Sequence, residues 1–253
     1  VQETAQFAMD TIEADLRMAS NWGRTSRYMA VDFRSDPGVD PNPANLPEPA
    51  ECGAGWALNL ALALDGDNNQ YSLNCAAQPD AQANSDFFTV RRATVEPVAL
   101  EAGRLQLHTS RTQGALLADG TPPFVSAEAT THNLIVNTYY VANDSPLIPG
   151  TPTLRRKTLT SAGGAPVIVD QEIAPGVENL QIQFGVDTNE DNTVDRYVNP
   201  GDPIYIPGAA GNIPGARIIT ARVWLVVRGL APEVGIVDNR DYEPGDVDLG
   251  TFN

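Results

Sequence analysis

The first 20 residues carry the pattern that most restricts the fold, an amphipathic helical repeat. Its apolar members recur at spacings of four, three, four and three residues, on one face of an α-helix: Ala5, Met9, Ile12, Leu16 and Ala19. No Gly or Pro interrupts this pattern before Gly23, a residue type that commonly ends helices. Because a helix of this length is marginal in isolation, its apolar face needs a packing partner. The pattern therefore predicts a leading helix that lies on a sheet.

Most of the remaining chain shows the alternation of apolar and polar residues that is typical of β-strands. The expected strands are 56–64, 71–73, 87–95, 104–109, 133–141, 153–160, 167–173, 179–186 and 218–227. Short turn segments separate several of them, which favours antiparallel pairing. The run 218–227 is the most apolar, so we expect it to be central in its sheet. One helix followed by antiparallel strands predicts an α+β fold.

The charge of the chain restricts its partners. The 253 residues have a formal net charge of −16, and so acidic a surface repels nucleic acid and anionic lipid. No run of 18 apolar residues is present that could span a membrane. We therefore expect neither nucleic acid nor a membrane surface as a partner of this sequence.

Two cysteines, Cys52 and Cys75, lie 23 positions apart outside any C-x-x-C motif. In an exported protein they are expected to form a disulfide, which restricts the unfolded chain and stabilises the fold by about 3 kcal/mol. In a cytosolic protein, two reduced buried thiols are the alternative.

Several stretches resemble, in order, the PilW family of type IV pilus minor pilins. Residues 2–19 resemble the exposed half of the family's long first helix, and residues 110–114 (S-R-T-Q-G) resemble a family turn. Two further stretches, 134–141 and 154–157, resemble two of its strands. The strongest resemblance is V-E-N-L-Q-I-Q-F-G-V-D at 177–187, which continues to D-R-Y-V at 195–198. Together these stretches span most of the chain.

This resemblance implies a pilin fold, in which an N-terminal amphipathic helix packs on an antiparallel β-sheet enlarged with a second sheet. Residues 1–22 would be the C-terminal half of the spine helix, and residues 23–228 the β domain with a Pro-rich loop at 34–55. Residues 229–253 would be an acidic loop or tail. The family's hydrophobic N-terminal half-helix is missing from this sequence, and only that segment would contact a membrane.

The resemblance also implies a structural role rather than an enzymatic one. The chain would assemble with other minor pilins at the tip of a bacterial type IV pilus, prime polymerisation and carry a tip adhesin. It would be extracellular there, after passing the inner membrane and periplasm. Relatives end in a further apolar or basic strand that this sequence does not show, so one sheet edge is left open, and either a strand from a partner or truncation of the sequence would explain it.

Residues 187–195 have the spacing of a calcium-binding loop. Oxygen-bearing residues stand at positions 1, 3, 5, 7 and 9 of an EF-hand-type pattern: Asp187, Asn189, Asp191, Thr193 and Asp195. Position 6 is Asn192 instead of Gly, and position 12 is Val198 instead of the bidentate Glu, so a further ligand such as Asp202 would be needed. We expect structural Ca²⁺ here, against the alternative of an acidic, solvated hairpin loop.

The sequence offers little support for catalysis. The motifs G-x-S-x-G, G-x-G-x-x-G and H-E-x-x-H are absent, and the only histidines, His108 and His132, lie in or beside expected strands. Two alternatives to a minor pilin remain: a secreted Ca²⁺-dependent carbohydrate-binding module and a type II secretion pseudopilin. The leading helix argues against the first, and gene context would separate the second.

Overall fold

The computed structural model describes residues 1–26, 31, 46–122, 124–230 and 238–251. Within these ranges the chain forms one α-helix, two short 3-10 helices and ten strands. The helices are α1 (Gln2–Arg17), η2 (Ala50–Cys52) and η3 (Pro203–Tyr205). The strands are β1 (Leu64–Asp67), β2 (Phe87–Ala93), β3 (Gln106–Thr109), β4 (Gly114–Leu117), β5 (Thr130–Ala142), β6 (Thr153–Ala162), β7 (Ala165–Pro175), β8 (Val177–Asp187), β9 (Arg196–Val198) and β10 (Arg217–Val227).

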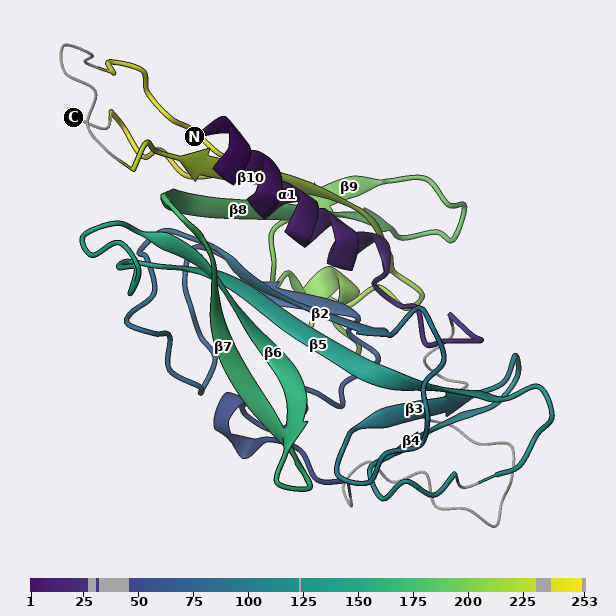
Figure 1. The fold of residues 1–253 in the computed structure, drawn as a ribbon. Helices are drawn as coiled ribbons and strands as arrows, with labels where there is room; N and C mark the ends of the chain where they lie inside the picture. Colours follow the sequence, from purple (N-terminus) through teal and green to yellow (C-terminus); the bar gives the residue numbers. More distant parts are fainter. Residues whose placement is uncertain (27–30, 32–45, 123, 231–237, 252–253) are drawn as a thin grey trace.

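The strands form two antiparallel sheets (Figure 1). The seven-stranded sheet has the order β1-β2-β5-β3-β4, and β6 pairs with both β5 and β7. The long strand β5 makes this possible because β3 pairs with its beginning, β2 with its middle and β6 with its end. The second sheet has three strands in the order β10-β8-β9.

The predicted α+β pilin fold is wrong, because the described structure is mostly β. The leading helix itself is confirmed at Gln2–Arg17, but its 16 residues make it only about 24 Å long. The main core is built largely by the two sheets: α1 contributes Ile12, while Phe88, Tyr139 and Phe184 come from β2, β5 and β8. A helix followed by strands in the sequence therefore did not indicate a long helix packed on one sheet.

Two strand predictions also need correction. Residues 56–63 form turns instead of a strand, and yet Trp56 and Leu60 are buried in a second core cluster. The carboxylate of Glu48 accepts hydrogen bonds from the amides of Gly55, Ala57 and Leu58, which stabilises this turn. Residues 71–73 form no strand either. At 56–63 the apolar alternation therefore reflects the burial of residues such as Trp56 and Leu60, and not an extended backbone.

The predicted disulfide between Cys52 and Cys75 is confirmed. It joins η2 to the segment that leads into β2, and the hydroxyl of Tyr71 donates to the carbonyl of Cys75. Of the expected Pro-rich loop, residues 34–45 lie outside the described residues.

The C-terminal residues 238–251 form no helix or strand but are held against the second sheet. Pro244 is buried, and the carboxylate of Asp246 accepts hydrogen bonds from the side-chain amides of Asn68, Asn69 and Asn199. The rest of the expected acidic tail, 231–237 and 252–253, lies outside the described residues. Polar contacts therefore hold residues 238–251 in place, although the sequence predicted only an acidic loop or tail.

Asp86 lies near the contacts of Asp246, and we expect it to make the stability of the fold depend on pH. Its carboxylate is 1% exposed and accepts only backbone N–H groups, from Asn69 and Ile182. Burial raises its pKa from 3.8 to about 6, and the nearby Asp246 and Asp67 raise it further, against the lowering effect of the two amides. Because the folded state binds this proton more tightly than the unfolded state, protonation of Asp86 stabilises the fold as the pH falls from 7 towards 4.

We expect this residue to add about 1 kcal/mol to the free energy of unfolding between pH 7 and pH 5. Urea unfolding at both pH values measures the change in the wild type and in Asp86→Asn. The amide does not titrate, so the variant should lack this increment. An identical pH dependence in both proteins would contradict the assignment.

Candidate functional site

Strand β10 has an open edge. Among the described residues its only strand partner is β8, and none of its 11 residues is fully buried. The expectation that 218–227 is central in its sheet is therefore wrong. A strand this apolar is unusual at an edge, where unpaired N–H and C=O groups invite another chain.

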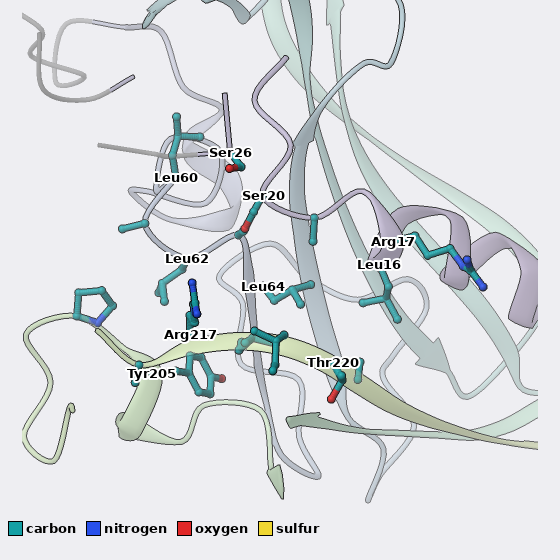
Figure 2. A pocket seen from close by; sticks show the side chains of 18 of the residues that line it. Leu16, Arg17, Ser20, Ser26, Leu60, Leu62, Leu64, Tyr205, Arg217 and Thr220 are labelled. Carbon is teal, nitrogen blue, oxygen red and sulfur yellow. The ribbon is translucent and has the colours of Figure 1, made fainter. Parts of the chain in front are cut away.

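An apolar groove of about 1220 Å³ follows this edge. Figure 2 shows the β10 ribbon crossing the groove, with Leu62 and Leu64 beside the ribbon and Leu16 directed towards it from α1. Its apolar lining comes from α1, from the segment before β1, from the segment after η3 and from β10: Met9, Ile12, Leu16, Leu60, Leu62, Leu64, Ile213, Ile218, Ile219, Ala221 and Val223.

The groove is an incomplete side of the main core. Ile12, Leu62 and Leu64 are buried in that core, whereas Leu16 and Val223, which pack against the same core, remain partly exposed. Contiguous exposed apolar surface of this kind typically marks a contact site for another molecule. The groove is therefore the candidate functional site.

One wall of the groove is α1, which Asp15 fastens to the seven-stranded sheet. Its Oδ1 accepts a hydrogen bond of 2.8 Å from Nε of Arg92 on β2. Its Oδ2 accepts hydrogen bonds of 2.6 Å each from the amide of Asn137 and the hydroxyl of Tyr139 on β5. The carboxylate is buried, so these contacts hold the helix at a fixed place beside β10.

The charged side chains at the groove are paired with acidic groups. Arg17 pairs with Glu13 one turn earlier on α1, and Arg217 at the start of β10 pairs with Asp187 at the end of β8. Burial opposes ionisation of Asp187, but hydrogen bonds from Arg217 and from backbone amides outweigh it and lower its pKa to about 2. Asp187 is therefore ionised at neutral pH and ties β10 to β8.

Asp187 is the last residue of β8, and the other predicted calcium ligands lie in the loop between β8 and β9. Asp187 accepts from Arg217 and from the amides of Asn189, Glu190 and Asn192. Asp191 accepts from Thr193, and Asp195 accepts from Thr188.

No group of three or more His, Cys, Asp or Glu side chains in the described chain is placed to hold a metal ion. The proposed extra ligand, Asp202, instead accepts the amide of Ile204 as the cap of η3. Calcium binding stays a prediction, which calorimetric titration with millimolar Ca²⁺ tests.

The histidines are held by hydrogen bonds within the seven-stranded sheet. His108 bonds to Thr131, and His132 bonds to Thr130 and to the carbonyl of Thr94.

Sequence reasoning missed the groove because its walls come from four separate segments. The one signal that could have pointed to it is the strongly apolar run at 218–227, which the structure places in an edge strand.

Residues 138–253 match the model of the family PilW, described as type IV pilus-assembly protein W, so the match covers the end of β5 and the strands β6 to β10. Searches of curated proteins and of solved structures found nothing similar.

The match confirms the resemblance of this chain to PilW-like type IV pilus proteins. It indicates a role in type IV pilus assembly, contact with other pilus components and a location in the envelope or outside the cell. No helix within the described residues has both the length and the apolar character needed to cross a bilayer.

Proposed function

We propose that this PilW-like chain is a non-enzymatic minor pilin, which assembles with other minor pilins at the tip of a type IV pilus. There it primes polymerisation and presents an adhesin. The observation that supports an assembly subunit best is the apolar groove beside the open edge of β10, because a subunit interface needs apolar surface and unpaired backbone.

The two alternative functions, a carbohydrate-binding module and a type II secretion pseudopilin, have less support. A carbohydrate-binding module would use exposed aromatic rings, but Trp22 and Trp56 are buried in the second core cluster. Only Trp224, on β10, is partly exposed, and it has no aromatic cluster around it among the described residues. A type II secretion pseudopilin would share the same assembly surface, and the neighbouring genes distinguish it from a pilin.

The test combines gene deletion with a matched pair of variants. Ile219 lines the groove and Val169 lies on β7 outside the groove lining; their exposures are 36% and 37%. We expect deletion to reduce surface piliation. The variant Ile219→Glu should lose co-purification with the other minor pilins, because it buries a carboxylate in any apolar interface. Val169→Glu should retain it.

Two outcomes together would overturn the proposal. These are normal piliation after deletion of the gene, and co-purification of the intact protein with no other minor pilin.

A further inference from the structure

We propose that a small polar cavity on the seven-stranded sheet binds a neutral sugar ring through its hydroxyl groups. The cavity has a volume of about 240 Å³ and is lined by β1, β2 and the segments 52–59 and 72–73, which the disulfide holds together. It shares no lining residue with the apolar groove beside β10. The site goes beyond the assembly role proposed above and does not depend on it.

The floor of the cavity follows from the pairing of β1 with β2. Asp65 lies directly opposite Thr89, and side chains two residues apart on a strand share one face of the sheet, so Asp65, Thr89 and Arg91 lie on the same face. The alternate residues of β2, Phe88 and Val90, are buried in the main core on the other face. The cavity therefore lies behind the apolar core, on the opposite face of the same strand.

Arg91 is the buried charge of this cavity. Its side chain is 3% exposed, and Nε and Nη1 donate to the carbonyls of Trp56 and Leu62 at 2.7 and 2.6 Å. The third nitrogen, Nη2, donates no hydrogen bond within the described chain, and Oδ2 of Asp65 lies 3.9 Å from it. Burial lowers the pKa of Arg91 to about 10, so the guanidinium is charged at neutral pH and has a donor left to satisfy.

The gap between Arg91 and Asp65 fits one oxygen atom. An oxygen about 2.8 Å from both Nη2 and Oδ2 closes a triangle on the 3.9 Å separation, and it accepts a hydrogen bond from the first and donates one to the second. The other carboxylate oxygen of Asp65 accepts the amide of Gly66, so Oδ2 is the oxygen left to accept. A hydroxyl accepts and donates through one atom, whereas a carboxylate only accepts and an ammonium only donates.

The charges around the gap favour a neutral ligand. Asp65 and Glu48 both lie close enough to Arg91 to raise its pKa against the effect of burial. An anion beside Arg91 would meet these two carboxylates on a protein of net charge −16, and a cation would meet the guanidinium itself. A hydroxyl group of an uncharged molecule avoids both repulsions.

The size of the cavity favours one ring. A water molecule takes about 30 Å³ of liquid volume, so a cavity of about 240 Å³ is much larger than a single bridging water needs. It is also smaller than the usual 300–1,000 Å³ of pockets for drug-sized ligands. A compact ring that carries several hydroxyl groups matches both limits.

Further polar groups stand at the mouth of the cavity. Asn59 and Ser72 are exposed lining residues, and their side chains make no hydrogen bond within the described chain, so additional hydroxyls of a ring find donors and acceptors there. The aromatic walls, Trp56 and Phe87, are buried. Recognition would therefore rest on hydrogen bonds and not on an exposed aromatic platform.

Calorimetric titration and saturation-transfer NMR on the purified protein test the site. The probes are the methyl glycosides of glucose, galactose, mannose and N-acetylglucosamine, with glycine and sulfate as charged comparisons. Because a few hydrogen bonds hold the ring, we expect at least one sugar to bind with a Kd on the order of 1 mM. Glycine and sulfate should not bind at ten times that concentration.

Variants at the mouth make the outcome specific, and thermal unfolding shows that each one folds. Asp65→Asn keeps an oxygen for the Gly66 amide and turns an NH₂ group towards Arg91, so sugar binding should weaken at least about tenfold. Ala54→Trp fills the mouth from an exposed position and should abolish binding. Asn143→Ala removes an exposed amide outside the cavity and should bind the sugar as the wild type does.

Four results would each overturn the proposal. These are no binding of any of the sugars, tighter binding of glycine or sulfate than of a sugar, sugar binding that Asp65→Asn and Ala54→Trp leave unchanged, and a crystal structure with the sugar in which only water fills the cavity. None of them bears on piliation or on co-purification with other minor pilins, so the proposed function stands or fails separately.

Discussion

The variant Asp15→Ala is expected to lose about 3–5 kcal/mol of unfolding free energy, a large fraction of the stability of an ordinary domain. Removal of the carboxylate leaves the guanidinium of Arg92 without its charged partner in a partly buried site. It also removes the acceptor of the Asn137 amide and the closest acceptor of the Tyr139 hydroxyl, which keeps only the carbonyl of Thr11 at 3.4 Å. Burial, and then the charge of Asp15, raise the pKa of Tyr139, so its hydroxyl is protonated at neutral pH and needs an acceptor.

A matched control exists on the same helix. Asp10 is exposed and its carboxylate accepts only the side chain of Gln6, so Asp10→Ala should change the stability by less than about 1 kcal/mol. Urea unfolding measures both variants, and hydrogen–deuterium exchange of α1 shows whether the helix loosens. If Asp15→Ala were no less stable than Asp10→Ala, this carboxylate would not be what fastens α1 to the sheet.

Local patterns predicted what depends on neighbours in the sequence. The helical spacing of Ile12 and Leu16 gave α1, because a 3.6-residue period is a property of the segment itself. The disulfide followed because only Cys52 and Cys75 exist. The apolar run at 218–227 was correctly expected to be a strand, but its position in the sheet depends on which distant segment pairs with it.

The structure of the candidate site likewise depends on contacts between residues that are far apart in the sequence. Spacing predicts Asp187 as a calcium ligand, but it could not show that this carboxylate also accepts hydrogen bonds from backbone amides and from Arg217, 30 residues away. The buried role of Asp15 was equally hidden, since its partners lie 77 to 124 residues further along the chain. Helical periodicity assigns such a carboxylate to the polar face, and only the folded chain shows that it is buried.

A second, largely buried carboxylate joins β6, β7 and β5, and its side chain is 10% exposed. Asp170 on β7 accepts hydrogen bonds of 2.8 Å from Nε of Arg155 and 2.6 Å from Nζ of Lys157, both on β6, and 2.6 Å from the hydroxyl of Tyr140 on β5. Arg155 and Lys157 are 6% and 3% exposed, and Lys157 also donates to the carbonyl of Ala76. Two cations are therefore compensated inside the protein largely by one anion, with Glu172 3.8 Å from Arg155.

The variant Asp170→Ala is expected to cost about 3–5 kcal/mol, because it leaves Lys157 and Arg155 buried without this partner. Lys157 is the only lysine of the chain, so its reaction with an amine-specific reagent, read by mass spectrometry, reports this site alone apart from the N-terminal amine. We expect slow modification in the wild type and faster modification in the variant. The exposed neighbour Gln171, changed to Ala, should alter neither stability nor reactivity.

A double variant separates the lost charge from lost packing. Lys157→Met removes one of the two stranded cations and keeps a side chain of similar length, so Lys157→Met with Asp170→Ala should be more stable than Asp170→Ala alone. The difference arises because the penalty in the single variant comes mainly from burying an uncompensated ammonium group. If the two losses of unfolding free energy simply added, Asp170 and Lys157 would act independently, and the ion pair would not be what makes this part of the sheet stable.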